Sequence, residues 1–366
     1  MIGWNALVLL AAVNVTPSAI PPPPEQVMAI PPELHRQLQV QVIDKVNAPE
    51  QRMQRLVDLV FQPQRLDPAL GAADLQYDTT ATLTVAEAWA QRRANCLTFT
   101  LLFTALAREA GLDAQVQEVG QVIGWYQEQG VIYNAGHVNV GLRVDGRRAT
   151  LDLDQNVLYD RRGPQPVSDQ RALAHFYNNR GAELMATGDN GSARAYLQMA
   201  LRMDPRFAPA WNNLGVLETR AGNNPAAAQA FDKALHDAPT LASALANASA
   251  LYQRMGQPQL AARLDSRLQQ VHGRDPFHQF MQGVAAERRG DYAQAVAAYR
   301  HAIQLYGNAH QFHFGLARAY FLDGDNRRAM RELARARELG GNDHVRTLYQ
   351  SKLDSLRRLG NRHAMR

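Results

Sequence analysis

The sequence predicts an α+β domain that contains a small antiparallel sheet, followed by an all-α superhelix built from repeated pairs of helices. Three observations support this prediction. Glycines recur every 34 residues in the second half of the chain, an Asp145-Gly146 pair joins two alternating runs, and the only cysteine, Cys96, begins an apolar helical run. The 366 residues are 46% hydrophobic and 20% charged, which is a globular composition in a chain long enough to bury a core.

The N-terminus carries a short apolar segment, Ala6–Val13, followed by small residues up to Ala19 and a proline run at 21–24. Eight apolar residues are too few to span a bilayer, which needs about 20. The pattern is typical of a secretory signal, although no Lys or Arg precedes the apolar core. We therefore expect residues 1–19 to be a signal peptide, residues 20–32 to be a Pro-rich linker, and the protein to be exported to the periplasm or the cell exterior. No other segment is long and apolar enough to be transmembrane.

Residues 33–168 form the predicted α+β domain. Apolar residues at helical spacing predict one or two amphipathic helices within 33–80. Thr84 and Glu87 have the spacing of a capping box, in which each residue accepts a hydrogen bond from the backbone of the other. A helix is therefore expected over about 85–93.

Cys96 occupies a position with chemical consequences. Asn95 before it is a good N-cap residue, and apolar residues then recur at helical spacing until Gly111. A helix N-terminus carries about half a positive charge and unpaired N–H groups, which stabilise a thiolate and can donate to an oxyanion. A lone cysteine excludes an internal disulfide and an iron–sulfur site. By position alone, a nucleophile and a buried core residue are equally open readings of Cys96.

A β-hairpin is predicted around the Asp-Gly pair at 145–146, because such a pair between alternating runs is the strongest short hairpin signal. A two-residue turn sets a register in which His137 lies across from Asp154 and has Asp152 as its diagonal neighbour on the same face. Either aspartate could orient the imidazole. A cysteine nucleophile, a histidine base and a carboxylate together make a complete set for acyl transfer.

The residues of this domain resemble the transglutaminase-like superfamily over about 76–156. The resemblance lies in Ala94-Asn-Cys96 opening an apolar helix, His137 beginning a strand, and an aspartate 15 residues later. It implies a papain-like fold that processes amides, with Cys96, His137 and Asp152 as the catalytic residues. The family usually has a glycine where this chain has Ala94.

Residues 169–342 carry the 34-residue period. The recurring glycines are Gly188, Gly222, Gly256, Gly290 and Gly324. An alanine follows each glycine after five residues, and a small residue precedes each by seven. Two antiparallel helices in each unit can meet closely at the small residues, and a glycine ends the first helix because it readily adopts a positive φ. Five units are predicted, with residues 343–366 as a capping helix and basic tail.

The second unit resembles the tetratricopeptide repeat closely. The resemblance lies in the Trp-Asn-Asn-Leu-Gly motif at 211–215, followed by Gly222 and Ala227, and extends over about 174–342. It implies a right-handed superhelix whose concave face binds peptides or protein partners.

Charge and histidine placement bear on other partners. The formal net charge is +5, and residues 324–366 hold 11 Lys and Arg against 5 Asp and Glu, which hints at an anionic partner. No interleaved aromatic platform accompanies these cations, so nucleic-acid binding is not expected. His310 and His313 could share a metal, but no third ligand is evident, so neither a metal nor a cofactor is expected.

The leading hypothesis is an exported cysteine-nucleophile enzyme that acts on a peptide or protein amide and uses its repeats to recruit a substrate or partner. Water or a second amine would resolve the thioester, so hydrolysis and cross-linking both stay open. The alternative is a catalytically inactive adaptor for protein–protein interaction. The presence of Cys96, His137 and Asp152 together argues against that alternative.

Overall fold

The computed structural model describes residues 20–67, 75–79, 82–119, 127–128, 131–132, 137–153, 163–341 and 343–364. The predicted signal peptide (1–19) and Asp154 lie outside the described residues, so both expectations stay predictions. Within the described part of the chain, no helix combines the length and the apolar character needed to cross a membrane.

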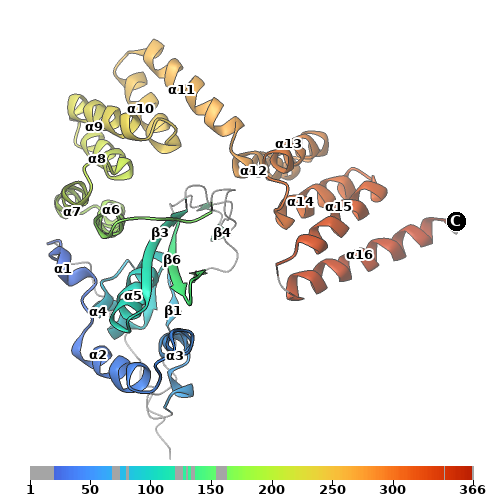
Figure 1. The fold of residues 1–366 in the computed structure, drawn as a ribbon. Coiled ribbons are helices and arrows are strands. Elements are labelled where there is room, and N and C mark those ends of the chain that lie inside the picture. The colour runs from blue at the N-terminus through green and yellow to red at the C-terminus, as the bar shows by residue number, and fades with distance from the viewer. Residues whose placement is uncertain are drawn as a thin grey trace, which may run out of the picture.

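The N-terminal region combines short helices with small sheets (Figure 1). Its helices are α1 (Pro24–Val27), α2 (Pro32–Leu38), the π-helical η1 (Gln39–Ile43), α3 (Pro49–Phe61), the 3-10 turn η2 (Pro63–Arg65), α4 (Val85–Gln91) and α5 (Cys96–Glu109). Its strands are β1 (Gln76–Tyr77), β2 (Arg93–Ala94), β3 (Asp113–Val119), β4 (Gln127–Glu128), β5 (Val131–Ile132), β6 (His137–Val144), β7 (Arg147–Leu151) and β8 (Gln165–Pro166). The main sheet is antiparallel in the order β7-β6-β3-β8, and β1-β2 and β4-β5 form separate pairs.

These strands confirm an α+β region with a small antiparallel sheet. The papain-like arrangement expected for it is not shown, because the described residues contain only the four-stranded sheet and two two-stranded pairs. The hairpin prediction is confirmed in detail. Asp145 and Gly146 form the turn with positive φ, and Val144 pairs with Arg147.

The capping prediction for α4 is also confirmed. The Thr84 hydroxyl accepts from the Glu87 backbone N–H at 3.2 Å, and the Glu87 carboxylate accepts from the Thr84 N–H at 2.8 Å. The helix ends at Gln91, two residues earlier than expected. The reason is local: Arg92 adopts a left-handed φ of 53°, which ends the helix and turns the chain into β2.

Helix α5 is the centre of the N-terminal region, and residues 97–107 along it are all buried. Phe99, Phe103 and Leu106 belong to the core shared with α2, α3 and α4. Leu97 and Leu101 instead belong to a core that includes the first repeat helices. The helix therefore joins the N-terminal region to the repeats by direct packing.

The second half is a succession of five antiparallel helix pairs that follow a curved path (Figure 1). The pairs are α6 (Asp169–Thr187) with α7 (Asn190–Met203), α8 (Ala208–Arg220) with α9 (Asn224–Asp237), α10 (Ala242–Arg254) with α11 (Pro258–Gly273), α12 (Pro276–Arg288) with α13 (Tyr292–Leu305), and α14 (His310–Leu322) with α15 (Asn326–Leu339). All five recurring glycines have φ between 71° and 86° directly after or near the end of the first helix of a pair, as the period predicts. A last helix, α16 (Asp343–Ala364), packs Tyr349 and Leu353 against α15.

The Pro-rich segment before α2 is packed rather than extended into solvent. Val27 is fully buried in the core that includes the first repeat. The Tyr177 hydroxyl donates to the Pro22 carbonyl at 2.7 Å, and the Tyr196 hydroxyl donates to the Ile20 carbonyl at 3.4 Å. This segment therefore attaches to α6 and α7.

The close approach of the two helices in each pair gives a testable prediction. A Cβ at Gly283 would lie 2.5 Å from the Tyr299 ring, which is fully buried. Gly283→Ala should therefore destabilise the protein by about 1–3 kcal/mol through overpacking, despite the better helix propensity of alanine. Urea denaturation followed by circular dichroism measures this cost.

Gly273→Ala is the matched control, because nothing lies within 4 Å of a Cβ at that helical position. It should leave the urea midpoint unchanged or raise it. Equal midpoints for the Gly283 variant and the wild type would contradict the packing argument.

Candidate functional site

The loop before α5 holds Cys96 at the N-terminus of a buried helix, as the sequence predicts. Asn95 caps the helix by accepting from the Thr98 N–H at 2.8 Å. Its amide donates to the Thr82 hydroxyl at 2.8 Å, so both ends of the Asn95 side chain are held. Cys96 itself is a free, half-buried cysteine. The Cys96 side chain therefore lies beside the unpaired N–H groups of the first helical turn.

His137 and Asp152 form a buried pair at the start of β6. His137 Nε2 lies 2.6 Å from Asp152 Oδ2, and the two side chains are 5% and 10% exposed. The Asn139 amide also donates to Asp152 Oδ2, at 3.2 Å. The β6-β7 ladder ends at the pair Val140–Leu151, so its register sets Asp152 opposite Asn139 and diagonal to His137. This is the diagonal relation that the hairpin register predicts.

Cys96 and His137 are brought together from elements 41 positions apart in the chain. Burial lowers the pKa of His137, but hydrogen bonds to Asp152 and Cys96, together with their negative charges, outweigh it and raise the pKa to about 9. Thr100 ties these elements together by donating to the Cys96 carbonyl at 2.7 Å and lying 3.3 Å from the Val138 carbonyl.

The arrangement can support proton transfer between a thiol and an imidazole. A raised pKa keeps the imidazole protonated at neutral pH, so that it can supply a proton to a leaving amine. Asp152 holds the ring in one orientation and stabilises its positive charge. The helix N-terminus adds donors where an oxyanion would form.

A hydrogen-bonded chain from the first repeat reaches this loop, and sequence reasoning missed it. Glu183 on α6 accepts hydrogen bonds from Thr82, whose hydroxyl accepts from the N-cap Asn95. Burial raises the pKa of Glu183 to about 7, although Thr82 and the charge of Arg180 lower it. No local signal in the sequence pairs residue 183 with residue 82, because the contact depends on how α6 packs on the N-terminal region.

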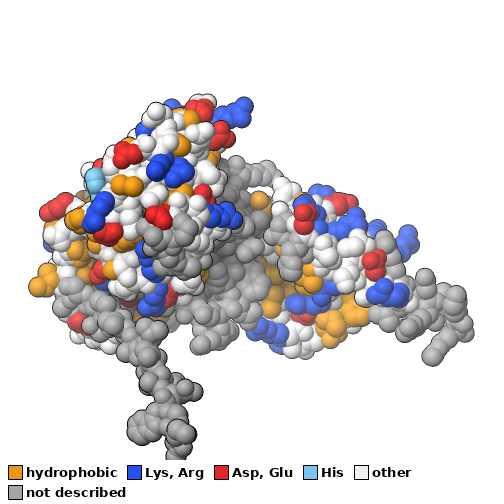
Figure 2. Space-filling view, turned by 90° about the horizontal axis from the view of Figure 1, so that it is seen from below, with side chains coloured by type: hydrophobic (Ala, Val, Ile, Leu, Met, Phe, Trp, Pro, Cys, Tyr) orange, Lys and Arg blue, Asp and Glu red, His pale blue; other side chains and the backbone are white. Residues whose placement is uncertain are grey.

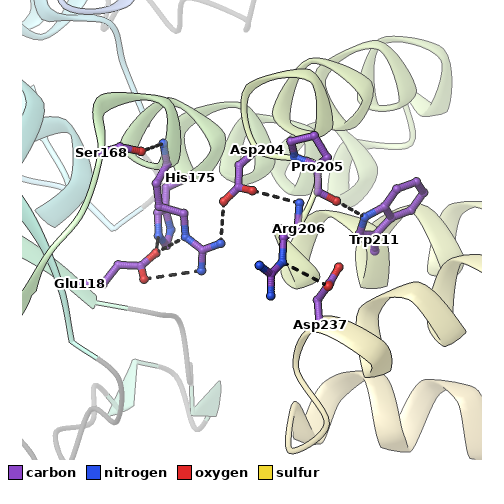
Figure 3. Close-up of polar contacts among 9 residues, drawn as sticks. Glu118, Ser168, His175, Asp204, Pro205, Arg206, Trp211 and Asp237 are labelled. Atoms are coloured by element: carbon purple, nitrogen blue, oxygen red, sulfur yellow. Dashed lines mark hydrogen bonds and ion pairs between the residues drawn. The ribbon is translucent and has the colours of Figure 1, made fainter.

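A second polar cluster connects the end of β3 with the first two repeats (Figure 3). Glu118 accepts from Arg171 Nε at 2.6 Å and pairs with His175, and Arg171 also donates to Asp204 at 2.8 Å. Burial raises the pKa of Glu118, but hydrogen bonds and charges of His175 and Arg171 lower it to about 2. Arg206 continues the row with an ion pair to Asp237 at 3.6 Å. The sequence analysis singled out none of these residues.

A cavity of about 1420 Å³ lies between the sheet and the repeats. Glu118, Val119 and His137 line it on the sheet side, and residues from α6 to the start of α12 line it on the repeat side. His137 is thus the member of the candidate triad that borders this space.

Two other expectations concern histidines and metals. His310 Nδ1 lies 2.8 Å from the Tyr349 hydroxyl, and His313 is hydrogen-bonded to Glu332 and to the Gly307 carbonyl. Both rings therefore have structural partners. The described residues contain no group of three His, Cys, Asp or Glu side chains arranged to hold a metal ion.

Comparison with known proteins identifies the class of the repeat region. Tetratricopeptide repeat models match residues 178–242 and 286–351. The helix pairs within these two segments therefore match the tetratricopeptide repeat, as their 34-residue period predicts. Both matched segments lie outside the region that holds Cys96, His137 and Asp152. No curated protein matches the chain.

Solved structures that match this chain include two that are described as TPR proteins. YrrB, described as a TPR protein with an unusual peptide-binding site, is 17% identical, with 49% of this chain and 92% of that chain covered and a TM-score of 0.26. PilF of Pseudomonas aeruginosa is 18% identical, with coverages of 52% and 86% and a TM-score of 0.29. A thermophilic TPR protein of Thermus thermophilus is 20% identical, with coverages of 49% and 98% and a TM-score of 0.27.

The His137–Asp152 pair predicts a specific titration. Asp152→Asn removes the carboxylate charge that faces His137 Nε2, so the pKa of His137 should fall by about 1–2 units from its value of about 9. A histidine whose pKa is raised on folding stabilises the folded state fully at pH values below its unfolded pKa of about 6.5. The wild type should therefore lose this stability as the pH rises through 9, and Asp152→Asn, in which the pKa of His137 is raised less, should lose less. Proton NMR titration of the imidazole resonances measures the shift.

His310 is the internal reference for that experiment. Burial lowers its pKa, and its partner Tyr349 lies far along the chain from the substitution, so its titration should be the same in both proteins. A wild-type His137 that titrates at its ordinary pKa of about 6.5 would contradict the buried pair.

Proposed function

We propose that this chain is an interaction protein whose tetratricopeptide repeats bind a peptide or protein partner. The observation that carries the proposal is the pair of repeat-model matches, at 178–242 and 286–351. Tetratricopeptide proteins bind such partners, and a stack of five helix pairs presents an extended surface for one. The matches favour the adaptor reading over the enzyme, because they identify the repeats and not the cysteine-bearing region.

Amide side chains linked between neighbouring repeats support binding of a polypeptide. The Asn213 amide on α8 donates to Asn178 on α6 at 2.9 Å. The Asn247 amide on α10 donates to Asn212 on α8, also at 2.9 Å. These links place donors and acceptors at one-repeat intervals along the first helices of the pairs, where an extended backbone could add to them.

Substitution of these amides tests partner binding. Asn213→Ala with Asn247→Ala should remove one specific protein from the set that co-purifies with the full chain, because two points of polar contact are lost. Affinity purification with quantitative mass spectrometry measures the loss. Gln229→Ala, at an exposed position on α9, is the control and should keep the partner. Full retention of every partner by the double variant, with its melting temperature intact, would count against binding at these amides.

A second function, thiol-dependent acyl transfer, is favoured by the geometry of Cys96, His137 and Asp152. Its support is the 2.6 Å contact of His137 with Asp152 and the contribution of Cys96 to the raised pKa of His137. This is the constellation of the transglutaminase-like superfamily that the N-terminal region resembles. Cys96 sulfur would attack an amide carbonyl, and His137 would protonate the departing amine to leave a thioester. Water or a second amine would then release the acyl group and regenerate the thiol.

Alkylation of the only cysteine tests this second function without a known substrate. Iodoacetamide should label Cys96 readily at pH 6, where an ordinary thiol of pKa about 8.5 is hardly ionised, because the His137 imidazolium is present at that pH. His137→Ala and Asp152→Asn should each slow labelling by about tenfold or more. Mass spectrometry of the intact chain gives the rates.

His35→Ala is the matched control, because His35 also pairs with a carboxylate, Glu109, but on the exposed surface of α2. It should label at the wild-type rate. If wild type, His137→Ala and a free cysteine peptide all label equally slowly, Cys96 is an inert structural residue and the acyl-transfer proposal fails.

A further inference from the structure

The cavity between the sheet and the repeats has two walls of different origin. On the sheet side, Glu118 and Val119 come from the end of β3, and His137 comes from the start of β6. The repeat side consists mainly of the turns that join one helix pair to the next, at 204–209, 237–243 and 270–276, which we name the turn edge. The two walls are held together through Glu118, Arg171 and Asp204 (Figure 3).

The size of the cavity favours a polymer segment over a small molecule. Its volume of about 1420 Å³ exceeds the roughly 300–1,000 Å³ of ordinary small-ligand pockets. The turn edge belongs to three successive repeats, so a ligand lying along it would be extended. An extended peptide meets both requirements.

The charges that face this space select for an acidic segment. Among the described lining residues, the exposed charged side chains are all arginines: Arg206, Arg267 and Arg274. Arg206 is paired with Asp237, so Arg267 and Arg274 are the cations open to a ligand. The carboxylates of the lining are only half-exposed and already engaged, with Asp237 paired to Arg206 and Asp275 accepting two backbone N–H groups at the start of α12. Exposed cations along a shared cleft attract carboxylates by direct pairing and by the focused field.

The same features disfavour a nucleic acid. Phe207 is the only Phe, Tyr or Trp among the described lining residues, and it is fully buried, so it offers no stacking face. In the view of Figure 2, Lys and Arg side chains are scattered over both described masses and interspersed with Asp and Glu, so this face shows no continuous basic surface of the kind that follows a phosphate backbone.

We propose that the cavity binds an acidic peptide segment along the turn edge and presents it to the thiol beside His137. The second part of this proposal rests on the acyl-transfer function proposed above. Since His137 lines the cavity and its pKa is raised by Cys96, a segment lying there borders the imidazole that interacts with the thiol. The repeats would then select the substrate through its charge, and the N-terminal region would act on it.

Fluorescence anisotropy with the full chain tests the binding site. The probes are a fluorescein-labelled decapeptide with four glutamates, the same peptide with four glutamines, and a ten-nucleotide oligothymidine. The glutamate peptide should bind best, and Arg267→Gln and Arg274→Gln should each weaken it about threefold, with little effect on the glutamine peptide. Arg263→Gln is the control, because Arg263 is exposed on the same helix as Arg267 but does not line the cavity. Equal binding by all variants, or preference for the oligothymidine, would overturn the proposal.

Alkylation of Cys96 in the presence of the glutamate peptide tests the second part. A saturating amount should slow iodoacetamide labelling at least threefold in wild type, and the effect should disappear in Arg267→Gln with Arg274→Gln at the same peptide concentration. Arginine-dependent binding without protection would overturn the presentation of the segment to the thiol. A third outcome is that the peptide binds in an arginine-dependent way while Cys96 fails to react with iodoacetamide even without peptide. This outcome would support the peptide site and refute only the acyl-transfer function.

Discussion

The packing of α5 on both sides is the constraint on which the rest of this structure depends. One side of the helix completes the core of the N-terminal region, and Leu97 and Leu101 on the other side enter a core that contains the first repeat. A helix buried all round cannot shift without opening a cavity in one core or the other, which costs several kcal/mol for a large side chain. The N-terminus of α5, and therefore Cys96, is fixed relative to the sheet and to the repeats at once.

Polar contacts of buried side chains also fix the position of the α5 N-terminus. Asn95 caps α5 and is itself held by Thr82, which also contacts Glu183 of the first repeat. Burying so many polar groups is costly unless each is paired, so such a network has few alternative arrangements. The same reasoning applies to His137, whose ring is buried between a carboxylate and a thiol. The attraction between the His137 imidazolium and the Asp152 carboxylate offsets the free-energy cost of removing both groups from water.

The two proposed functions depend on different physical features. Partner binding relies on repetition, because the same packing of helix on helix is repeated until an extended surface forms. Thiol chemistry relies on one irregular place, where the start of α5 and the start of β6 meet. The cavity that borders His137 and the turn edge is where these two features come together. Substrate choice and bond chemistry would then belong to separate parts of one chain.

Local sequence determined much of the fold, because the responsible interactions act within a few residues. The capping box at Thr84, the N-cap at Asn95 and the Asp145-Gly146 turn are each satisfied by neighbouring backbone, and all three occur as predicted. The five helix pairs likewise follow from glycines that need positive φ at one period. Even the diagonal relation of His137 to Asp152 follows from the register that a two-residue turn imposes.

Only the tertiary structure decided the contacts between distant segments. Glu183 reaches Thr82, Arg171 reaches Glu118, and Tyr177 reaches Pro22 because α6 packs on the N-terminal region in one orientation. No periodicity or motif encodes that orientation, since it depends on the shapes of two whole surfaces. The sequence by itself therefore determined which elements form and which residues could carry chemistry. The three-dimensional packing determined that a cavity lies beside His137, because a cavity exists only where surfaces from separate elements meet without filling the space between them.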